Sequence, residues 1–256
     1  MRISGTRRAR RTAPARYGTA AAASATALAL GLGLAGCGSG GAKGGGSGER
    51  SAEPAARAAD PTRIPDVGDR MQSKIPDSAR QVVAVYGKGA DSPDNTVQLF
   101  TRRESKGKWT REASWSGHNG RKGWTPDHRQ DDKRSPVGVF TLSDAGGMLP
   151  EPKGTKLPYE HSTGFTPSPN WPKATRHDFD HVVAVDYNRV KGRSPLDMTR
   201  PQGDDKGGSI WLHMDHGSGT SGCVSISKSG MRKLLGTLDP KQHPVVVMGD
   251  KASLSR

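Results

Sequence analysis

The chain has 256 residues, enough for one ordinary domain with extra segments or for two small domains at most. Hydrophobic residues make up 32% and aromatic residues only 5%, so not every segment can belong to a packed core. The formal net charge of +14 is compatible with nucleic-acid binding, but no Arg/Lys–aromatic motif of an RNA- or DNA-binding module is present, and we expect no nucleic-acid partner.

The first 36 residues have the composition of an export signal. Six arginines and no acidic residue precede Thr19, and Ala and Leu then dominate as far as Gly36. We therefore predict a signal peptide over residues 1–36, with a transmembrane anchor as the alternative. Leu34-Ala35-Gly36-Cys37 resembles the lipobox of bacterial lipoproteins. That resemblance implies lipidation of Cys37 and an extracytoplasmic protein that is lipid-anchored to the cell membrane and faces the cell wall.

Removal of this segment lowers the positive charge of the chain. The formal net charge falls from +14 to +8, because 33 Lys and Arg then stand against 25 Asp and Glu. An exported protein meets anionic wall polymers and lipid headgroups first, so a solvated basic surface explains the remaining charge.

Residues 37–79 are predicted to be a lipid-anchored flexible linker. Gly and Ser dominate residues 38–48, an Ala/Pro/Glu/Arg stretch follows, and residues 64–79 remain polar and interrupted by Pro. We place the folded domain at residues 80–250 and a C-terminal tail at residues 251–256.

The domain has the pattern of a mostly β fold. Short β-branched or alternating runs predict strands at residues 81–86, 96–100, 108–115, 137–142, 182–187, 209–213, 224–226 and 245–248. The second and third of these runs are predicted to form a hairpin. Segments such as residues 143–180 are rich in Pro, Gly and charge, and we expect surface loops there that frame a groove.

One helix is predicted late in the chain. Ser227 is a suitable N-cap, and four apolar residues then recur with helical spacing: Met231, Leu234, Leu235 and Leu238. The sequence therefore predicts a single mostly β domain with one short helix packed on the sheet after Cys223.

Cys223 stands out as a lone thiol. The chain has two cysteines, and the lipobox accounts for Cys37. Because exported proteins usually pair their cysteines or lack them, an unpaired cysteine indicates a reactive residue.

Residues 209–226 carry the candidate chemistry. Strand alternation puts Trp211 and His213 on one face and, on the next strand, Cys223 and Ser225 on that same face. The core-facing residues of the two strands are then Ile210, Leu212, Val224 and Ile226. A nine-residue Gly-rich connection returns the chain, so we expect His213 and Cys223 to lie within hydrogen-bond reach.

This pair suits nucleophilic catalysis at a carbonyl group. A free thiol has a pKa of about 8.5 and reacts as the thiolate, so a neighbouring imidazole activates it by taking the proton or by forming an ion pair. Backbone N–H groups of Gly222 and Cys223, with Ser221, are candidate donors to the oxyanion of a tetrahedral intermediate. The substrate-binding candidates are His216, Thr220, Trp211 and Ser225, with His216 expected in an exposed loop.

The same residues resemble the YkuD-type L,D-transpeptidase catalytic domain. The resemblance is carried by Thr220-Ser221-Gly222-Cys223-Val224, by Ile210-Trp211-Leu212-His213, by the Pro-x-Gly-x-Phe segment within residues 135–140, and by Val185-Asp186-Tyr187-Asn188 of a divergent branch. It implies a single β-sandwich or barrel domain that uses no cofactor and no metal. Cys223 matches the nucleophile and His213 the base.

The resemblance also implies a reaction. The Cys attacks the amide between the third residue of a peptidoglycan tetrapeptide stem and its terminal D-Ala, and D-Ala leaves. An amine of a neighbouring stem then resolves the acyl-enzyme and gives a 3→3 cross-link. Water as the acceptor makes the enzyme an L,D-carboxypeptidase instead. We expect the protein to act as a monomer.

Two further alternatives remain open at this stage. Ser221 replaces a His, and Ser225 replaces an Arg or Asn, of the commoner family motif, which leaves room for an inactive wall-binding lipoprotein. A zinc peptidase is the other alternative, because His213, Asp215, His216 and Cys223 are all possible zinc ligands. Against it, His213-x-x-His216 in a loop differs from His-Glu-x-x-His on a helix.

Overall fold

The computed structural model describes residues 60–256. The predicted signal peptide, the lipidation site Cys37 and residues 38–59 of the predicted linker lie outside the described residues. Within residues 60–256, no helix combines the length and the apolar character needed to cross a bilayer.

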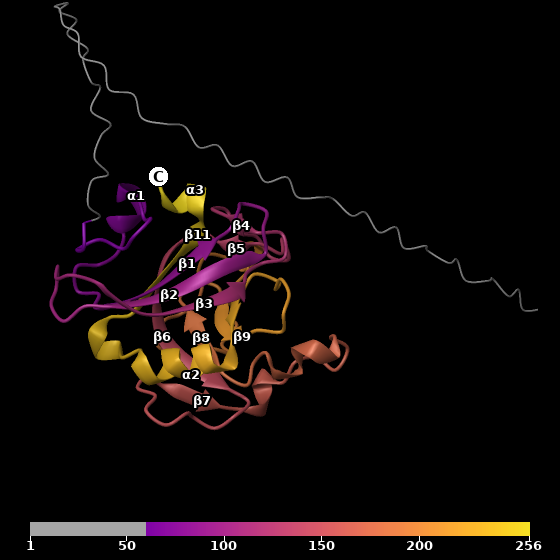
Figure 1. Cartoon of the computed structure of the whole chain (residues 1–256). Coiled ribbons are helices and arrows are strands. Elements are labelled where there is room, and N and C mark those ends of the chain that lie inside the picture. The colour runs from indigo at the N-terminus through magenta and orange to yellow at the C-terminus, as the bar shows by residue number, and fades with distance from the viewer. Residues whose placement is uncertain (1–59) are drawn as a thin grey trace, which may run out of the picture. The chain divides into compact units, whose positions relative to one another are not determined.

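Eight strands close into a barrel. Nine strands are hydrogen-bonded in the order β11-β1-β2-β3-β10-β9-β8-β6-β7, and β11 also pairs with β6, so the ring closes and β7 is added outside it (Figure 1). The strands are β1 (Gln81–Gly87), β2 (Asp94–Thr101), β3 (Thr110–His118), β6 (Gly138–Gly147), β7 (Tyr159–His161), β8 (Val182–Val185), β9 (Trp211–Met214), β10 (Val224–Ile226) and β11 (Val245–Asp250). The prediction of a mostly β barrel or sandwich is confirmed, including the β2–β3 hairpin.

The remaining elements are short. β4 (Trp124–Thr125) and β5 (Ser135–Pro136) form a separate two-stranded pairing. The helices are α1 (Asp69–Gln72), α2 (Lys228–Thr237) and α3 (Lys251–Leu254), with 3₁₀ turns η1 (Thr163–Phe165), η2 (Lys173–His177), η3 (Asp204–Lys206) and η4 (Pro240–Gln242).

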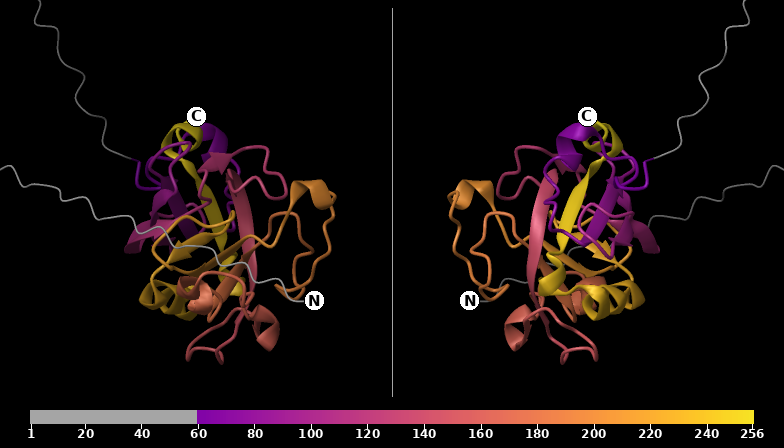
Figure 2. Two further views of the ribbon diagram at one scale, coloured as in Figure 1. Left: turned by 90° about the vertical axis from the view of Figure 1, so that its right-hand side faces the viewer. Right: turned by 90° about the vertical axis from the view of Figure 1, so that its left-hand side faces the viewer.

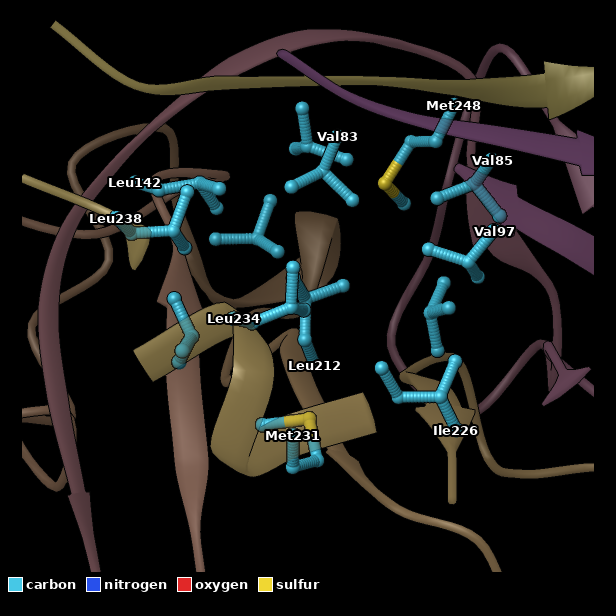
Figure 3. Close-up of a cluster of buried hydrophobic side chains, with 14 of the residues drawn as sticks. Val83, Val85, Val97, Leu142, Leu212, Ile226, Met231, Leu234, Leu238 and Met248 are labelled. Atoms are coloured by element: carbon cyan, nitrogen blue, oxygen red, sulfur yellow. The ribbon is translucent and has the colours of Figure 1, made fainter. Parts of the chain in front are cut away.

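The predicted helix is α2, and it supplies much of the barrel core. Ser227 caps it by accepting the N–H of Gly230 at 3.2 Å. The four predicted apolar residues are all fully buried: Met231, Leu234, Leu235 and Leu238. Figure 3 shows side chains of α2 pointing at valines of β1 and β2 and at Leu212 of β9. Full burial of each such side chain contributes about 1.5–3 kcal/mol, so α2 fixes the position of the strands that carry Cys223 and His213.

The predicted flexible linker is wrong for the residues that precede β1. Ile64, Val67, Met71 and Ile75 are buried against the outer face of β1, and Tyr86 Oη donates to the Pro65 carbonyl at 2.7 Å. Both faces of β1 are buried, so a second layer has to cover its outer face. These apolar residues are spaced irregularly among Pro and charged residues, so their spacing predicts neither a helix nor a strand and did not indicate that they pack on the domain.

The C-terminal tail is also folded, as α3. Asp250 caps it by accepting the N–H of Ser253 at 3.0 Å, and Leu254 is fully buried. The Leu254 carbonyl accepts the N–H of Gly68 at 2.8 Å, so the two ends of the described chain are joined. The folded domain therefore extends beyond the predicted limits of 80–250 on both sides.

The predicted surface loop at residues 143–180 is only partly correct. β6 continues to Gly147, β7 follows, and Phe165 is buried against residues of β8 and β9: Val182, Ala184 and Trp211. This segment forms a layer outside the barrel over β8 and β9. Phe165 and Phe179 of that layer share an apolar cluster with Cys223, and Ser209 of the next loop, residues 186–210, contacts its sulfur. This loop projects in orange from the barrel in Figure 2.

Candidate active site

Cys223 and His213 project from the same face of two neighbouring strands. Cys223 immediately precedes β10, which runs parallel to β9 with Ser225 opposite His213 and Val224 opposite Leu212. The inward-facing residues of this pair belong to the barrel core, as alternation predicted: Ile210, Leu212, Val224 and Ile226. Trp211 and Cys223 belong to a separate cluster on the outer face. His213 therefore lies one pleat further along the sheet than the thiol.

The thiol contacts backbone groups rather than the imidazole. Cys223 is partly exposed, its Sγ accepts the N–H of Trp211 at 3.4 Å, and its S–H donates to the carbonyl of Ser209 at 3.5 Å. No hydrogen bond joins Cys223 to His213 in the described residues, so the predicted direct contact is absent from this structure. The reason is the diagonal offset between the two residues, and catalytic hydrogen bonds are often long before substrate binds.

His213 is held in the tautomer that a general base needs. Its ring is buried, and Nδ1 lies 2.8 Å from the carbonyl oxygen of Met214. A carbonyl only accepts, so Nδ1 carries the hydrogen and Nε2 keeps its lone pair. The ring edge of Phe179 packs against the imidazole, with centroids 5.3 Å apart. Sequence reasoning missed the Met214 carbonyl because a backbone group leaves no signal in residue types.

Desolvation favours the neutral form of both groups, because protein atoms surround the His213 ring and also the Cys223 sulfur, although part of the Cys223 residue remains accessible. Desolvation lowers the pKa of His213 to about 4, and its hydrogen bond to Met214 only partly opposes this. Desolvation raises the pKa of the Cys223 thiol to about 11, the Trp211 N–H opposes the rise, and the Asp178 carboxylate adds to it. Of the two modes of activation expected from the sequence, these shifts favour transfer of the thiol proton to the imidazole over an ion pair formed in advance. At neutral pH the site holds a thiol and a neutral imidazole, so proton transfer has to accompany nucleophilic attack.

The glycine-rich loop shapes the backbone before the thiol. Gly222 has φ +150°, and a Cβ there would lie 3.1 Å from the Arg134 carbonyl oxygen. Thr220 Oγ1 donates to the Cys223 carbonyl at 2.6 Å and accepts the Gly222 N–H at 3.1 Å. The Gly222 amide is therefore already engaged, which corrects its assignment as an oxyanion donor. The amides of Ser221 and Cys223 remain the candidates.

Three of the predicted substrate-binding residues are enclosed. Ser225 is fully buried and donates to Asp215 at 2.6 Å, and Thr220 is buried with its hydroxyl bonded as above. Trp211 packs between the rings of Phe165 and Phe179, with centroids 5.7 and 5.1 Å away. In this structure Ser225 and Thr220 position the strands and the loop, because their hydroxyls bond to the protein itself, and Trp211 does so by ring packing.

His216 is not the exposed loop residue that we predicted. Its side chain is 11% exposed, and its Nδ1 lies 2.9 Å from Oδ2 of buried Asp178. Burial raises the pKa of Asp178 to about 6, and His216 opposes that rise. The Asp178 carbonyl accepts the N–H of Met214 at 2.9 Å. Asp178 thus holds the outer layer against β9 beside the thiol, and it was missed because it lies in a loop far away in sequence.

The four possible zinc ligands named from the sequence do not converge on one point. Asp215 contacts His118 Nδ1 at 2.7 Å, while His216 contacts Asp178. Among residues 60–256, no group of three or more His, Cys, Asp or Glu side chains has a metal-binding arrangement. The geometry of these side chains gives the zinc peptidase alternative no support.

The loop that carries the Ser209 carbonyl is anchored by a buried ion pair. Arg189 donates to Asp144 and Asp186, and all three side chains are at least nine-tenths buried. Asp186 is thus a structural hydrogen-bond acceptor. Further along, Arg200 donates to Ser209 Oγ at 2.6 Å, and Ser209 has φ +52°. The carbonyl that receives the Cys223 S–H is therefore fixed from both ends of the loop.

Two exposed apolar side chains border the site. In the part of the chain that the structure describes, the large hydrophobic residues with high exposure are Trp171 at 49% and Met198 at 69%. Trp171 packs edge-on against Phe179 at 6.2 Å, and Met198 Sδ lies 3.7 Å from Ser209 Oγ. Each thus contacts a direct neighbour of His213 or Cys223. Exposed apolar groups at such a position are typical of a binding surface.

Comparison with known proteins identifies a family but no individual relative. A family model described as the L,D-transpeptidase catalytic domain (YkuD) matches residues 78–247, which is more than half of the chain. The matched range contains Cys223, His213 and the layer over β8 and β9. No curated protein matches the chain.

Proposed function

The chain belongs to the L,D-transpeptidase (YkuD) catalytic domain family, and from that membership we propose that it transfers acyl groups of peptidoglycan stem peptides through a thioester on Cys223. One observation carries the assignment of roles. A partly exposed thiol and an imidazole with a free Nε2 lone pair lie on the same face of adjoining strands. The other face of those strands is the barrel core, so the pair is held on a rigid support.

Acylation follows from the neutral state of the pair. The Cys223 sulfur attacks the carbonyl carbon between the third stem residue and the terminal D-Ala, while His213 Nε2 takes the thiol proton. The N–H groups of Ser221 and Cys223 donate to the oxyanion that forms. The C–N bond then breaks, His213 returns the proton to the leaving amine, and D-Ala departs. A thioester between the stem and Cys223 remains.

Deacylation decides between two activities, and we propose amine transfer with formation of 3→3 cross-links. An amine of a neighbouring stem attacks the thioester and gives a proton to His213, the C–S bond breaks, and His213 returns that proton to the Cys223 sulfur. The apolar rings of Phe179 and Trp211 beside the pair, and the exposed apolar side chains of Trp171 and Met198, support a surface that binds a second stem peptide as the acceptor. Hydrolysis of the same thioester is the L,D-carboxypeptidase alternative.

We also propose that the domain works outside the cytoplasm, anchored by a lipid on Cys37. The support is the basic, then Ala/Leu-rich N-terminal sequence that ends in Leu-Ala-Gly-Cys. Peptidoglycan lies outside the membrane, so export places the enzyme with its substrate. Globomycin-sensitive processing and lipid labelling that disappears in Cys37→Ala are expected, and unchanged labelling would contradict the anchor.

The function is tested by product analysis. The wild-type chain and Cys223→Ala are incubated with purified tetrapeptide muropeptides, and the products are identified by mass spectrometry. We expect cross-linked dimers and free D-Ala from the wild type and neither from Cys223→Ala. Release of D-Ala without dimers would identify a carboxypeptidase. No product from a folded wild type that still binds the muropeptides would identify an inactive wall-binding protein.

A further inference from the structure

A cavity lined by charged and apolar residues lies beside the N-terminal part of α2, separate from the candidate active site. Its volume is about 270 Å³, and it is lined by residues 149–153, His181, Lys228 and Arg232. None of these residues contacts Cys223 or His213 through a hydrogen bond or ion pair. The volume is below the range of pockets for drug-sized ligands, so the cavity suits a compact group.

The charge of the lining is strongly positive. Lys153, Lys228 and Arg232 face a single acidic residue, Glu151. None of these four side chains forms an ion pair with another residue of the described range 60–256. The N-terminus of the ten-residue helix α2 adds its partial positive charge at the same place. The lining therefore favours an anion.

His181 gives the cavity a second, independent feature of a binding site. Its side chain is buried, with 3% of the residue exposed, yet it lines the cavity. Its Nδ1 lies 2.9 Å from Tyr159 Oη, and that hydroxyl donates to the Leu149 carbonyl at 2.9 Å. Since the tyrosine proton is used there, Nδ1 has to be the donor, and Nε2 carries a lone pair. Nε2 has no partner among the described residues, which leaves it for a ligand.

We propose that this cavity binds a phosphate group. Lys228, Arg232 and Lys153 balance its charge, and His181 Nε2 accepts the P–OH hydrogen of a phosphate or phosphomonoester monoanion. A carboxylate or sulfate brings no proton at neutral pH, so either needs a protonated His181 before the ring can donate to it. The cavity accommodates a phosphate with a short ester group. It takes the headgroup of a lipid only with the acyl chains outside.

The charged and titratable groups around His181 come from three elements. Tyr159 lies on β7 and Asp180 directly precedes His181, while the others are Glu151 and Lys153 of the loop and Lys228 and Arg232 of α2. Burial lowers the pKa of His181, Asp180 opposes this, and Arg232 and Lys228 lower it further. The ring is therefore neutral near pH 7, the state that distinguishes phosphate from sulfate.

The test is a titration of the purified chain with inorganic phosphate and with sulfate at pH 7. We expect saturable phosphate binding that shifts the ¹⁵N resonance of His181 Nε2, and weaker sulfate binding. Arg232→Gln should weaken phosphate binding about tenfold, as expected for loss of one charge-assisted hydrogen bond. The matched control is Lys233→Gln, which removes the same charge from the next, exposed residue of α2, and it should leave the affinity unchanged.

Two results would overturn the proposal: absence of saturable phosphate binding, or equal weakening by Arg232→Gln and Lys233→Gln. His181→Gln should abolish the preference for phosphate over sulfate. If that buried variant does not fold, the exposed Arg232 variant still decides the question. The proposal does not depend on the transpeptidase activity, so neither outcome bears on Cys223.

Flotation with vesicles identifies the source of the phosphate. Vesicles that contain phosphatidic acid, whose headgroup is a phosphomonoester, are compared with phosphatidylcholine vesicles for the wild type and the same two variants. A loss of flotation confined to Arg232→Gln assigns the site to a lipid headgroup. Equal flotation of both variants, together with Arg232-dependent phosphate binding, assigns it to a soluble phosphate.

Discussion

Burial has different consequences on the two faces of β9 and β10. The inner face carries Leu212, Val224 and Ile226, packed on α2, and strand alternation alone predicts each of them. The outer face carries His213 and Cys223 under a layer of loop residues, and there burial acts on groups that titrate. On the inner face burial supplies stability. On the outer face burial favours the neutral forms of a base and a nucleophile. Burying such polar groups lowers the free energy of unfolding, so the site is expected to reduce stability.

The largest expected effect is on the outer face. His213→Gln removes the general base but keeps a polar side chain of similar size, and we expect kcat/KM to fall about 10²–10⁴-fold. Steady-state kinetics of D-Ala release measure this. Thermal denaturation serves as the control, and the melting temperature should not drop. A variant that unfolds more readily yet keeps wild-type kcat/KM would assign His213 to the structure instead.

The adjacent residue on the inner face should behave in the opposite way. Leu212→Ala leaves a cavity beside α2, and we expect it to lower the free energy of unfolding by about 2–5 kcal/mol. Urea denaturation at pH 7 measures the loss. The remaining folded protein should retain near-normal kcat/KM. If Leu212→Ala removed activity without changing the urea midpoint, the two faces would not be separate in function.

The pH dependence of stability sharpens the comparison. Burial lowers the pKa of His213 to about 4 from the ordinary value of 6.5. Between pH 4 and pH 6.5, His213 is therefore protonated in the unfolded chain but neutral in the folded chain. The stability that a neutral His213 permits is thus complete above pH 6.5 and is lost as pH falls toward 4. The loss for this one residue amounts to about 3 kcal/mol.

His213→Gln isolates that contribution. The variant should lose less stability than the wild type when urea denaturation at pH 7 is compared with pH 4.5. The pH-dependent loss of the variant has to be subtracted from that of the wild type, because Asp178 also titrates. Its pKa is raised to about 6, so it changes the free energy of unfolding in the opposite direction over the same pH range. Parallel pH curves for the two proteins would show that the buried imidazole does not titrate as described.

A smaller effect is expected from the Asp178 carboxylate, whose charge acts on the thiol. Asp178→Asn removes a negative charge that raises the pKa of Cys223, so the thiolate fraction near neutral pH should increase. We expect alkylation of Cys223 by iodoacetamide to become faster, by up to about tenfold. Cys223→Ala provides the blank. An unchanged or slower rate at equal stability would mean that Asp178 does not act on the thiol through its charge.

The sequence predicted what depends on regular patterns. The barrel strands and α2 follow from alternation and helical spacing, and Cys223 and His213 follow from a lone thiol and the alternation of two strands. Ile64 and Met71 were missed because their packing depends on a surface of β1 that exists only in the folded protein. Asp178 and Phe179 were missed because they reach the site from a distant loop. The direction of the Cys223 pKa could not be predicted, since it depends on desolvation.

The central claim is that Cys223 becomes acylated by the stem peptide. Its most direct test is intact-mass and peptide-mapping mass spectrometry of the protein, quenched with acid soon after mixing with a tetrapeptide stem. The account predicts an adduct of the tripeptide acyl group, with D-Ala lost, on the peptide that contains Cys223, and no adduct on Cys223→Ala. Turnover of the substrate without any adduct at Cys223, or with an equal adduct in Cys223→Ala, would contradict it.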